Sequence, residues 1–81
     1  MAGYRFSVVI EKDSEGYFAF CPELQGCYTQ GNTYEEALEN IKDATRLHVE
    51  DRIASGEEIP QAESVILTSL EVAVWAKNFR E

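Results

Sequence analysis

The sequence predicts an α+β fold in which one long helix covers one face of a mixed sheet, in the chain order β-β-β-α-β. Two observations lead to this order. Residues alternate with a period of two over 4–12 and again over 69–74, as in half-buried strands, and the stretch 65–75 is rich in β-branched residues. Between them, residues 34–54 place apolar side chains at steps of three and four, as in an amphipathic helix.

The first three strands are expected to form an antiparallel meander. Residues 4–12 and 17–21 are separated only by a short turn that ends in glycine, which predicts a hairpin. Pro22 ends the second strand because proline has no N–H to donate to a strand ladder. Gly26 permits the positive φ with which the chain returns to the sheet, and residues 27–30 form the third strand.

The helix is expected to begin just after Gly31 and Asn32, which end the strand pattern. Thr33 and Glu36 form a capping box. The Thr33 hydroxyl accepts a hydrogen bond from the Glu36 backbone N–H, and the Glu36 carboxylate accepts one from the Thr33 N–H. Gly56 is placed to end the helix. The apolar face consists of Ala37, Leu38, Ile41, Ala44, Thr45 and His48.

A fourth strand is predicted over residues 65–75, after a polar linker in which Pro60 forbids a continuing helix. A strand, a long helix and a further strand of the same sheet imply a right-handed crossover, which puts the helix on one face. Three large apolar side chains are candidates for contacts with a partner or a second subunit: Leu47 on the helix flank, and Trp75 and Phe79 near the end of the chain.

The net charge is −8, from 15 acidic and 7 basic residues. Such a surface repels phosphate backbones, so direct binding to nucleic acid is disfavoured and a basic partner is favoured. No apolar run approaches the ~20 residues that cross a bilayer, and no signal peptide opens the chain. A cytoplasmic protein without membrane contact is therefore expected. A chain of 81 residues buries only about 60% of its unfolded surface, so a homo-oligomer, either dimer or tetramer, is also expected.

The sequence offers little for catalysis, and no enzyme activity, cofactor or metal is expected. Cys21 and Cys27 are expected to be free, partly buried thiols, with a regulatory bridge across the loop as the alternative. His48, the single histidine, is expected to pack on the helix face. The carboxylates around Glu11 and Asp13 are interpreted as solvated turn residues, and the five glycines are scattered singly, so no phosphate-binding loop is present.

The ordered motifs between residues 16 and 40 closely resemble the core motif of the HicB-like antitoxins. An aromatic strand is followed by Pro-Glu-Leu-Gln-Gly-Cys at residues 22–27, a short strand, Gly-Asn-Thr at 31–33 and Glu-Glu-Ala at 35–37. The resemblance covers about residues 4–75, so the chain 1–81 is expected to be a single HicB-like domain. Its structural motif residues are Pro22, Gly26, Cys27, Gly31, Thr33 and Glu36.

The resemblance implies a reduced ribonuclease-H-like fold, without that enzyme's metal-binding carboxylates and with strand 4 parallel to and beside strand 1. Proteins of this family neutralise HicA-type toxins, which are small basic proteins that cleave mRNA with a histidine, by covering the toxin's active surface. Many members also carry a C-terminal DNA-binding domain. Only a six-residue tail follows residue 75 here, so this chain is expected to act by occlusion alone.

Two other functions stay open at this point. One is an orphan structural or regulatory domain that self-associates and has neither a toxin partner nor a catalytic activity. The other is a residual metal-dependent nuclease, in which divalent metal would stimulate RNA cleavage and a change of Glu11 or Asp13 would abolish it.

Overall fold

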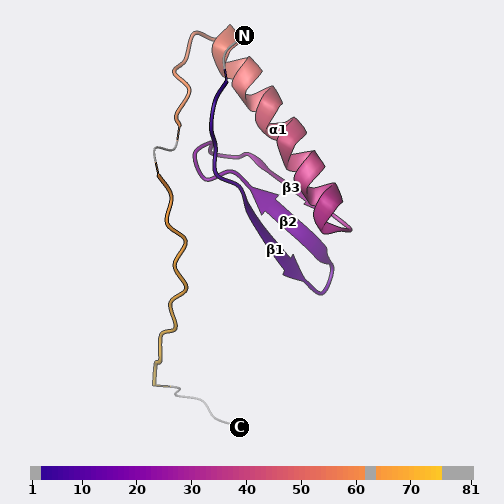
Figure 1. The fold of residues 1–81 in the computed structure, drawn as a ribbon, viewed down its shortest axis with the longest axis vertical. Coiled ribbons are helices and arrows are strands. Elements are labelled where there is room, and N and C mark those ends of the chain that lie inside the picture. Colours follow the sequence, from indigo (N-terminus) through magenta and orange to yellow (C-terminus); the bar gives the residue numbers. More distant parts are fainter. Residues whose placement is uncertain (1–2, 62–63, 76–81) are drawn as a thin grey trace.

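The structure is a computed structural model that describes residues 3–61 and 64–75. Within these residues, β1 (Val9–Asp13), β2 (Gly16–Phe20) and β3 (Tyr28–Gly31) are followed by α1 (Tyr34–Ala54). The strands form one antiparallel sheet in the order β1-β2-β3, and α1 lies across one of its faces (Figure 1). The α+β class, the meander and the long helix are thus confirmed. A single domain over 1–81 and the ribonuclease-H-like comparison stay predictions.

The first strand is shorter than the sequence pattern predicts. Pairing begins at Val9, whose partner is Phe20, the last residue of β2. Residues 4–8 continue the alternating pattern but lie outside the strand. The physical reason is that β2 ends before Pro22, so no neighbouring strand reaches the stretch that precedes Val9.

The core lies between the sheet, the β2–β3 loop and α1. Ala19 of β2 and the helix residues Ala37 and Ile41 are fully buried. The loop supplies the rest, because Cys21, Leu24 and Cys27 are each at most 2% exposed. Backbone hydrogen bonds from Leu24 N–H to Cys21 O and from Cys27 N–H to Leu24 O hold this loop in shape. The loop is therefore a structural part of the core, and Gly26, with φ +81°, provides the left-handed residue that its turn requires.

The junction between β3 and α1 depends on Gly31. A Cβ at this position would lie 2.5 Å from the backbone nitrogen of Ala37 and 2.9 Å from its Cα. Gly31 has no positive φ, so its role is close approach to the helix, whereas the sequence suggested only backbone freedom. The Thr33 hydroxyl accepts from the Glu36 N–H at 3.0 Å, as predicted. The Glu36 carboxylate accepts from the N–H of Asn32 and not from that of Thr33, which differs from the predicted capping box.

Residues 64–75 do not form the predicted fourth strand beside strand 1. They run as an extended segment away from the sheet without strand pairing, and every one of them is exposed (Figure 1). The sheet of the described chain is therefore antiparallel and not mixed. The linker is held at Arg5, whose N–H donates to Gln61 Oε1 at 3.1 Å. Since β1 begins only at Val9, the chain next to the linker presents no formed sheet edge to which the segment could add.

The projecting segment also makes the molecule long. The radius of gyration is 16.8 Å and the longest extent is 58 Å, whereas a compact chain of this length has a radius of gyration of about 12 Å. A single copy therefore leaves much of the C-terminal apolar surface in water.

The buried loop gives the first prediction. Leu24→Ala should lower the free energy of unfolding by about 2–5 kcal/mol, because it leaves a cavity in a well-packed core. Its exposed neighbour in the same loop gives a matched control, and Gln25→Ala should stay within about 0.5 kcal/mol of the parent. Urea unfolding followed by circular dichroism measures both. Equal, small effects would show that the loop is not part of the core.

Candidate functional site

An acidic cleft lies where the β1–β2 hairpin meets the start of α1. Its volume is about 800 Å³, and Glu11, Asp13, Glu15 and Glu36 contribute carboxylates to its lining. One basic residue, Lys12, shares this lining, and its Nζ lies 5.9 Å from the centre of the Tyr17 ring. The cleft is therefore strongly negative and suits a cationic side chain of a partner.

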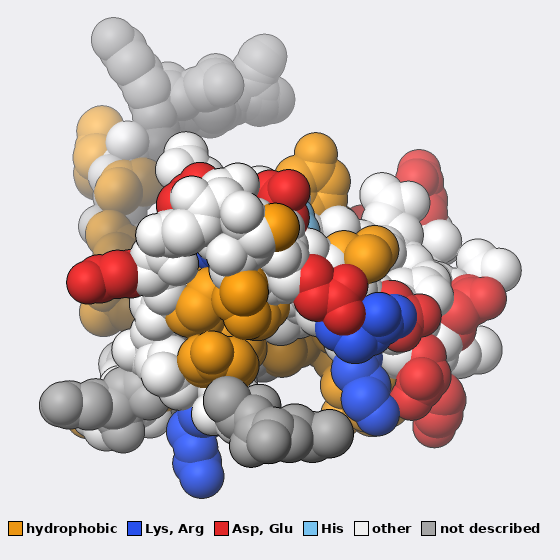
Figure 2. Space-filling view, turned by 90° about the horizontal axis from the view of Figure 1, so that it is seen from above, with side chains coloured by type: hydrophobic (Ala, Val, Ile, Leu, Met, Phe, Trp, Pro, Cys, Tyr) orange, Lys and Arg blue, Asp and Glu red, His pale blue; other side chains and the backbone are white. Residues whose placement is uncertain are grey.

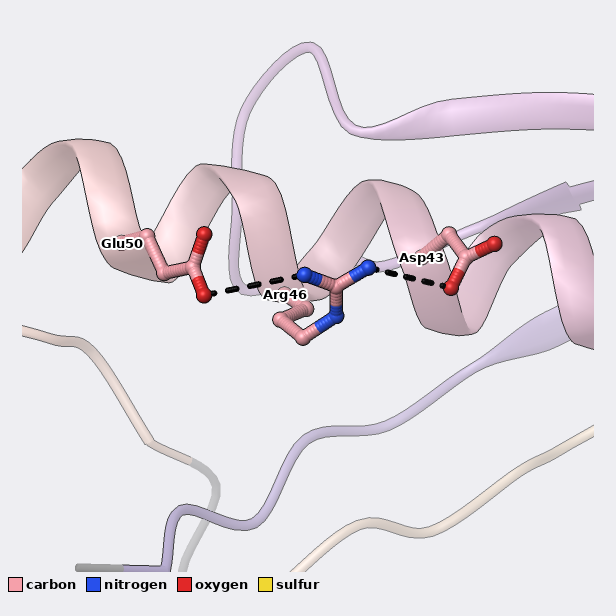
Figure 3. Close-up of polar contacts among 3 residues, drawn as sticks. All are labelled: Asp43, Arg46 and Glu50. Carbon is pink, nitrogen blue, oxygen red and sulfur yellow. Dashed lines mark hydrogen bonds and ion pairs between the residues drawn. The ribbon is translucent and has the colours of Figure 1, made fainter.

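The outer side of α1 continues this negative surface. Arg46 lies between Asp43 and Glu50, at 3.4 Å and 3.6 Å, on the exposed side of the helix (Figure 3). All three side chains are more than half exposed, so these pairs contribute well under about 1 kcal/mol each. Glu35 and Glu39 lie on α1 without an ion pair among the described residues. Figure 2 shows that acidic side chains outnumber basic ones on the face it presents.

The sheet face opposite α1 carries an aromatic cluster. Ala19 is buried against the helix side, so the pleat turns its neighbours Phe18 and Phe20 to the other face. Phe18 lies 5.9 Å from Phe20 and 5.8 Å from Tyr28 between ring centres. Tyr28 is 63% exposed. We name Phe18, Phe20 and Tyr28 the aromatic face. Aromatic side chains gathered on an uncovered sheet are typical of protein contact surfaces.

Sequence reasoning did not single out the aromatic face. The signal was present, because two phenylalanines flank a small residue in the second strand and alternation puts both on one face. Which face the helix would cover, and hence which residues stay open, was not readable from the strand alone.

Glu23 clasps the β2–β3 loop to the N-terminal stretch. Its two carboxylate oxygens accept from the Ser7 backbone N–H at 2.8 Å and from the Ser7 hydroxyl at 2.7 Å. The Cys21 thiol donates to the same carboxylate at 3.5 Å. Burial alone would raise the pKa of Glu23, but the hydrogen bonds from Ser7 outweigh it and lower the pKa below its ordinary value. This clasp joins residues far apart in sequence and was not predicted.

The two cysteines are free and buried. Each thiol has its own polar neighbour: Glu23 for Cys21, and the Thr45 hydroxyl, at 3.5 Å, for Cys27. Burial and the nearby Glu23 carboxylate raise the pKa of Cys21 to about 11. The Cys21 thiol is therefore protonated at neutral pH and is a poor nucleophile.

Of the three predicted interface residues, the structure describes Leu47 and Trp75, which lie on different parts of the chain. Leu47 lies on α1 and is 58% exposed, and Trp75 ends the described C-terminal segment and is 93% exposed. Phe79 lies outside the described residues. His48 is half-buried on α1. The interface role of these residues stays a prediction.

The described residues do not assemble a metal centre. Among residues 3–61 and 64–75, no three His, Cys, Asp or Glu side chains are grouped so that they could hold a metal ion. The carboxylates of Glu11 and Asp13 line the open acidic cleft instead, so the nuclease alternative gains no support from them. Within the same residues, α1 is too polar to serve as a membrane span.

Comparison with known proteins gives a consistent result. A family model described as the HicB-like antitoxin of bacterial toxin–antitoxin systems matches residues 6–78. A UPF0150 protein of Synechocystis sp. is 43% identical over 72 residues, which cover 88% of this chain and 90% of the relative. A UPF0150 protein of Helicobacter pylori is 45% identical over 67 residues, covering 83% and 93%.

A solved structure is also similar. A chain of the HicA3 and HicB3 toxin–antitoxin complex matches with a TM-score of 0.57 and 26% sequence identity, over 73% of this chain and 72% of that chain. The shared fold therefore occurs in a protein that forms part of a toxin–antitoxin complex.

The Glu23 clasp gives the second prediction. Its carboxyl pKa is lowered in the folded state, so the stabilisation is present above the unfolded pKa of about 4.3 and is lost as the pH falls through the folded value. Glu23→Gln should lower the free energy of unfolding by about 1–2 kcal/mol at pH 7. The gap from the parent should close between about pH 5 and pH 3.

Urea unfolding across this pH range measures the gap between parent and variant. Glu15→Gln, which changes an exposed carboxylate on the β1–β2 turn, is the control and should show a much smaller gap at pH 7. A gap for Glu23→Gln that stays constant with pH would contradict a role for its charge.

Proposed function

Because the chain belongs to the HicB-like antitoxin family of bacterial toxin–antitoxin systems, we propose that it binds and occludes a small basic toxin of the HicA type. It acts in the cytoplasm by binding alone, without a reaction, cofactor or nucleic-acid contact of its own. The observation that carries the proposal is the family match over residues 6–78. The similarity to a chain of a HicA–HicB complex supports it.

The charge of the described surface supports a basic partner. The acidic cleft and the outer side of α1 meet at the helix start, where Glu36 belongs to both. The whole chain carries a net charge of −8. Such a field speeds the encounter with a basic protein and repels RNA, so a toxin held there is kept from its substrate.

The outer side of α1 is suited to this contact because its carboxylates are available. Glu35 and Glu39 extend from a helix whose opposite side is anchored in the core by Ala37 and Ile41. A partner that binds there meets a preformed, rigid surface, which lowers the ordering cost of association. The aromatic face offers apolar contact area on the other side of the molecule.

A second candidate is a self-associating domain without a toxin partner. The exposed apolar side chains of residues 64–75 favour it. The two candidates differ in one result, because only the antitoxin binds a small basic protein that is encoded next to it.

The third prediction tests toxin binding. Co-expression with the product of the adjacent gene should rescue growth if that product is toxic, and the two proteins should purify together. A basic neighbour that neither binds nor is neutralised would contradict the proposal.

The contribution of α1 is measured with a matched pair of variants. Glu39→Lys reverses a charge on α1, and Glu58→Lys makes the same change in the exposed linker. The first should slow association several-fold at low salt, with the difference shrinking as salt is added. The second should change the rate much less. Equal effects would show that only net charge matters and that α1 is not the contact.

A further inference from the structure

Residues 64–75 expose a row of apolar side chains to solvent. Seven of their large side chains are at least 60% exposed: Val65, Ile66, Leu67, Leu70, Val72, Val74 and Trp75. In an extended chain, the even-numbered members share one face, and that face holds no charged residue. Single exposed apolar residues are ordinary on a protein surface, but a continuous β-branched row calls for a sheet neighbour.

The same molecule also has a strand edge without a neighbour. In the described chain β1 is one of the two outer strands, because the sheet order is β1-β2-β3. Residues 4–8 extend β1 in sequence and keep its alternation, yet they pair with nothing on either side. Within this stretch, Val8 is 40% exposed. Helix α1 packs mainly on β3 and least on β1. The segment of residues 64–75 has the composition of a strand, and the edge along residues 4–13 lacks a neighbouring strand of similar length.

The linker before residue 64 influences whether the apolar segment pairs with β1 of its own copy or of a second copy. Ile59 is half-buried, and Pro60 restricts it to extended geometry, so this stretch does not form a tight reversing turn. The linker is already anchored by the hydrogen bond from Arg5 N–H to Gln61 Oε1, and residues 64–75 diverge from their own sheet (Figure 1). An apolar segment that diverges from its own sheet and stays exposed in one copy can be covered by exchange between copies, which is a low-cost route to a dimer.

We propose that two copies of this chain exchange residues 64–75, so that each segment becomes the fourth strand beside β1 of the other copy. Residues 4–8 then gain a neighbour, and the apolar row is covered. The twelve residues of the segment, together with the edge of the partner's first strand, approach the ~20–30 residues a side of stable interfaces. The outer side of α1 takes no part, so the exchange is independent of toxin binding.

The fourth prediction follows, and the full-length chain is its test object. Sedimentation equilibrium should show a dimer. In a refolded mixture of labelled and unlabelled copies, isotope-filtered nuclear Overhauser spectra should show contacts between residues 64–75 of one copy and 4–10 of the other. A monomer, or a dimer in which these contacts arise only within one copy, would overturn the exchange. So would pairing between the two C-terminal segments themselves.

A pair of variants tests whether dimer formation depends on the apolar face of residues 64–75 or tolerates a charge anywhere in this segment. Leu70→Asp with Val72→Asp should give a monomer, because it puts two charges on the face that is covered in the exchanged dimer. Its α1 circular dichroism should persist, since the buried core lies elsewhere. Ser69→Asp places one charge on the opposite face of the same segment and should remain dimeric. Retention of a tight dimer by the double variant would overturn the proposal.

Discussion

The close approach of Gly31 to the first turn of α1 is the constraint on which the rest of the structure depends. No other residue fits there, because a Cβ would lie within 3 Å of the Ala37 backbone. This contact brings Ala37 and Ile41 onto the sheet and closes the core over the β2–β3 loop. It also commits the single described helix to one face. The aromatic face on the other side is left open as a consequence.

In this fold, the two sides of α1 have different roles. The buried side of α1 holds the core, while its exposed side carries the carboxylates of Glu35 and Glu39, which form no ion pair with any residue that the structure describes. The loop that joins β2 and β3 is fixed twice, by burial of Leu24 and by the Glu23 clasp on Ser7. A rigid acidic surface on a small chain is suited to the basic partner that we propose for it.

A single copy leaves the edge of β1 without a neighbouring strand and the side chains of residues 64–75 exposed to solvent. The core of the described chain has only small contributions from β1, and the strongest candidates for further burial, such as Val72 and Trp75, stand in water. Burial of apolar surface is the main favourable term in folding. In the exchange that we propose, a second copy covers this surface and adds to the stability of the fold.

Local features were readable from the sequence because their causes are local. The bounds of α1, its Thr33 cap and the strand meander follow from residue spacing, capping chemistry and turn residues within a few positions of one another. The ordered motifs between residues 16 and 40 also identified the family. Free, buried cysteines followed from their number and their place at the ends of a short loop.

Contacts between residues far apart in the sequence were decided only by the tertiary structure. The Glu23 clasp joins residues sixteen positions apart. The spacing of residues in the sequence does not predict such a contact. The β-branched composition of residues 65–75 is typical of a strand, but a strand needs an edge to pair with, and residues 4–8 beside the linker are not part of the sheet. Strand pattern is a property of a segment, whereas strand pairing is a property of two, which is why sequence determined the first and only the assembled chain determined the second.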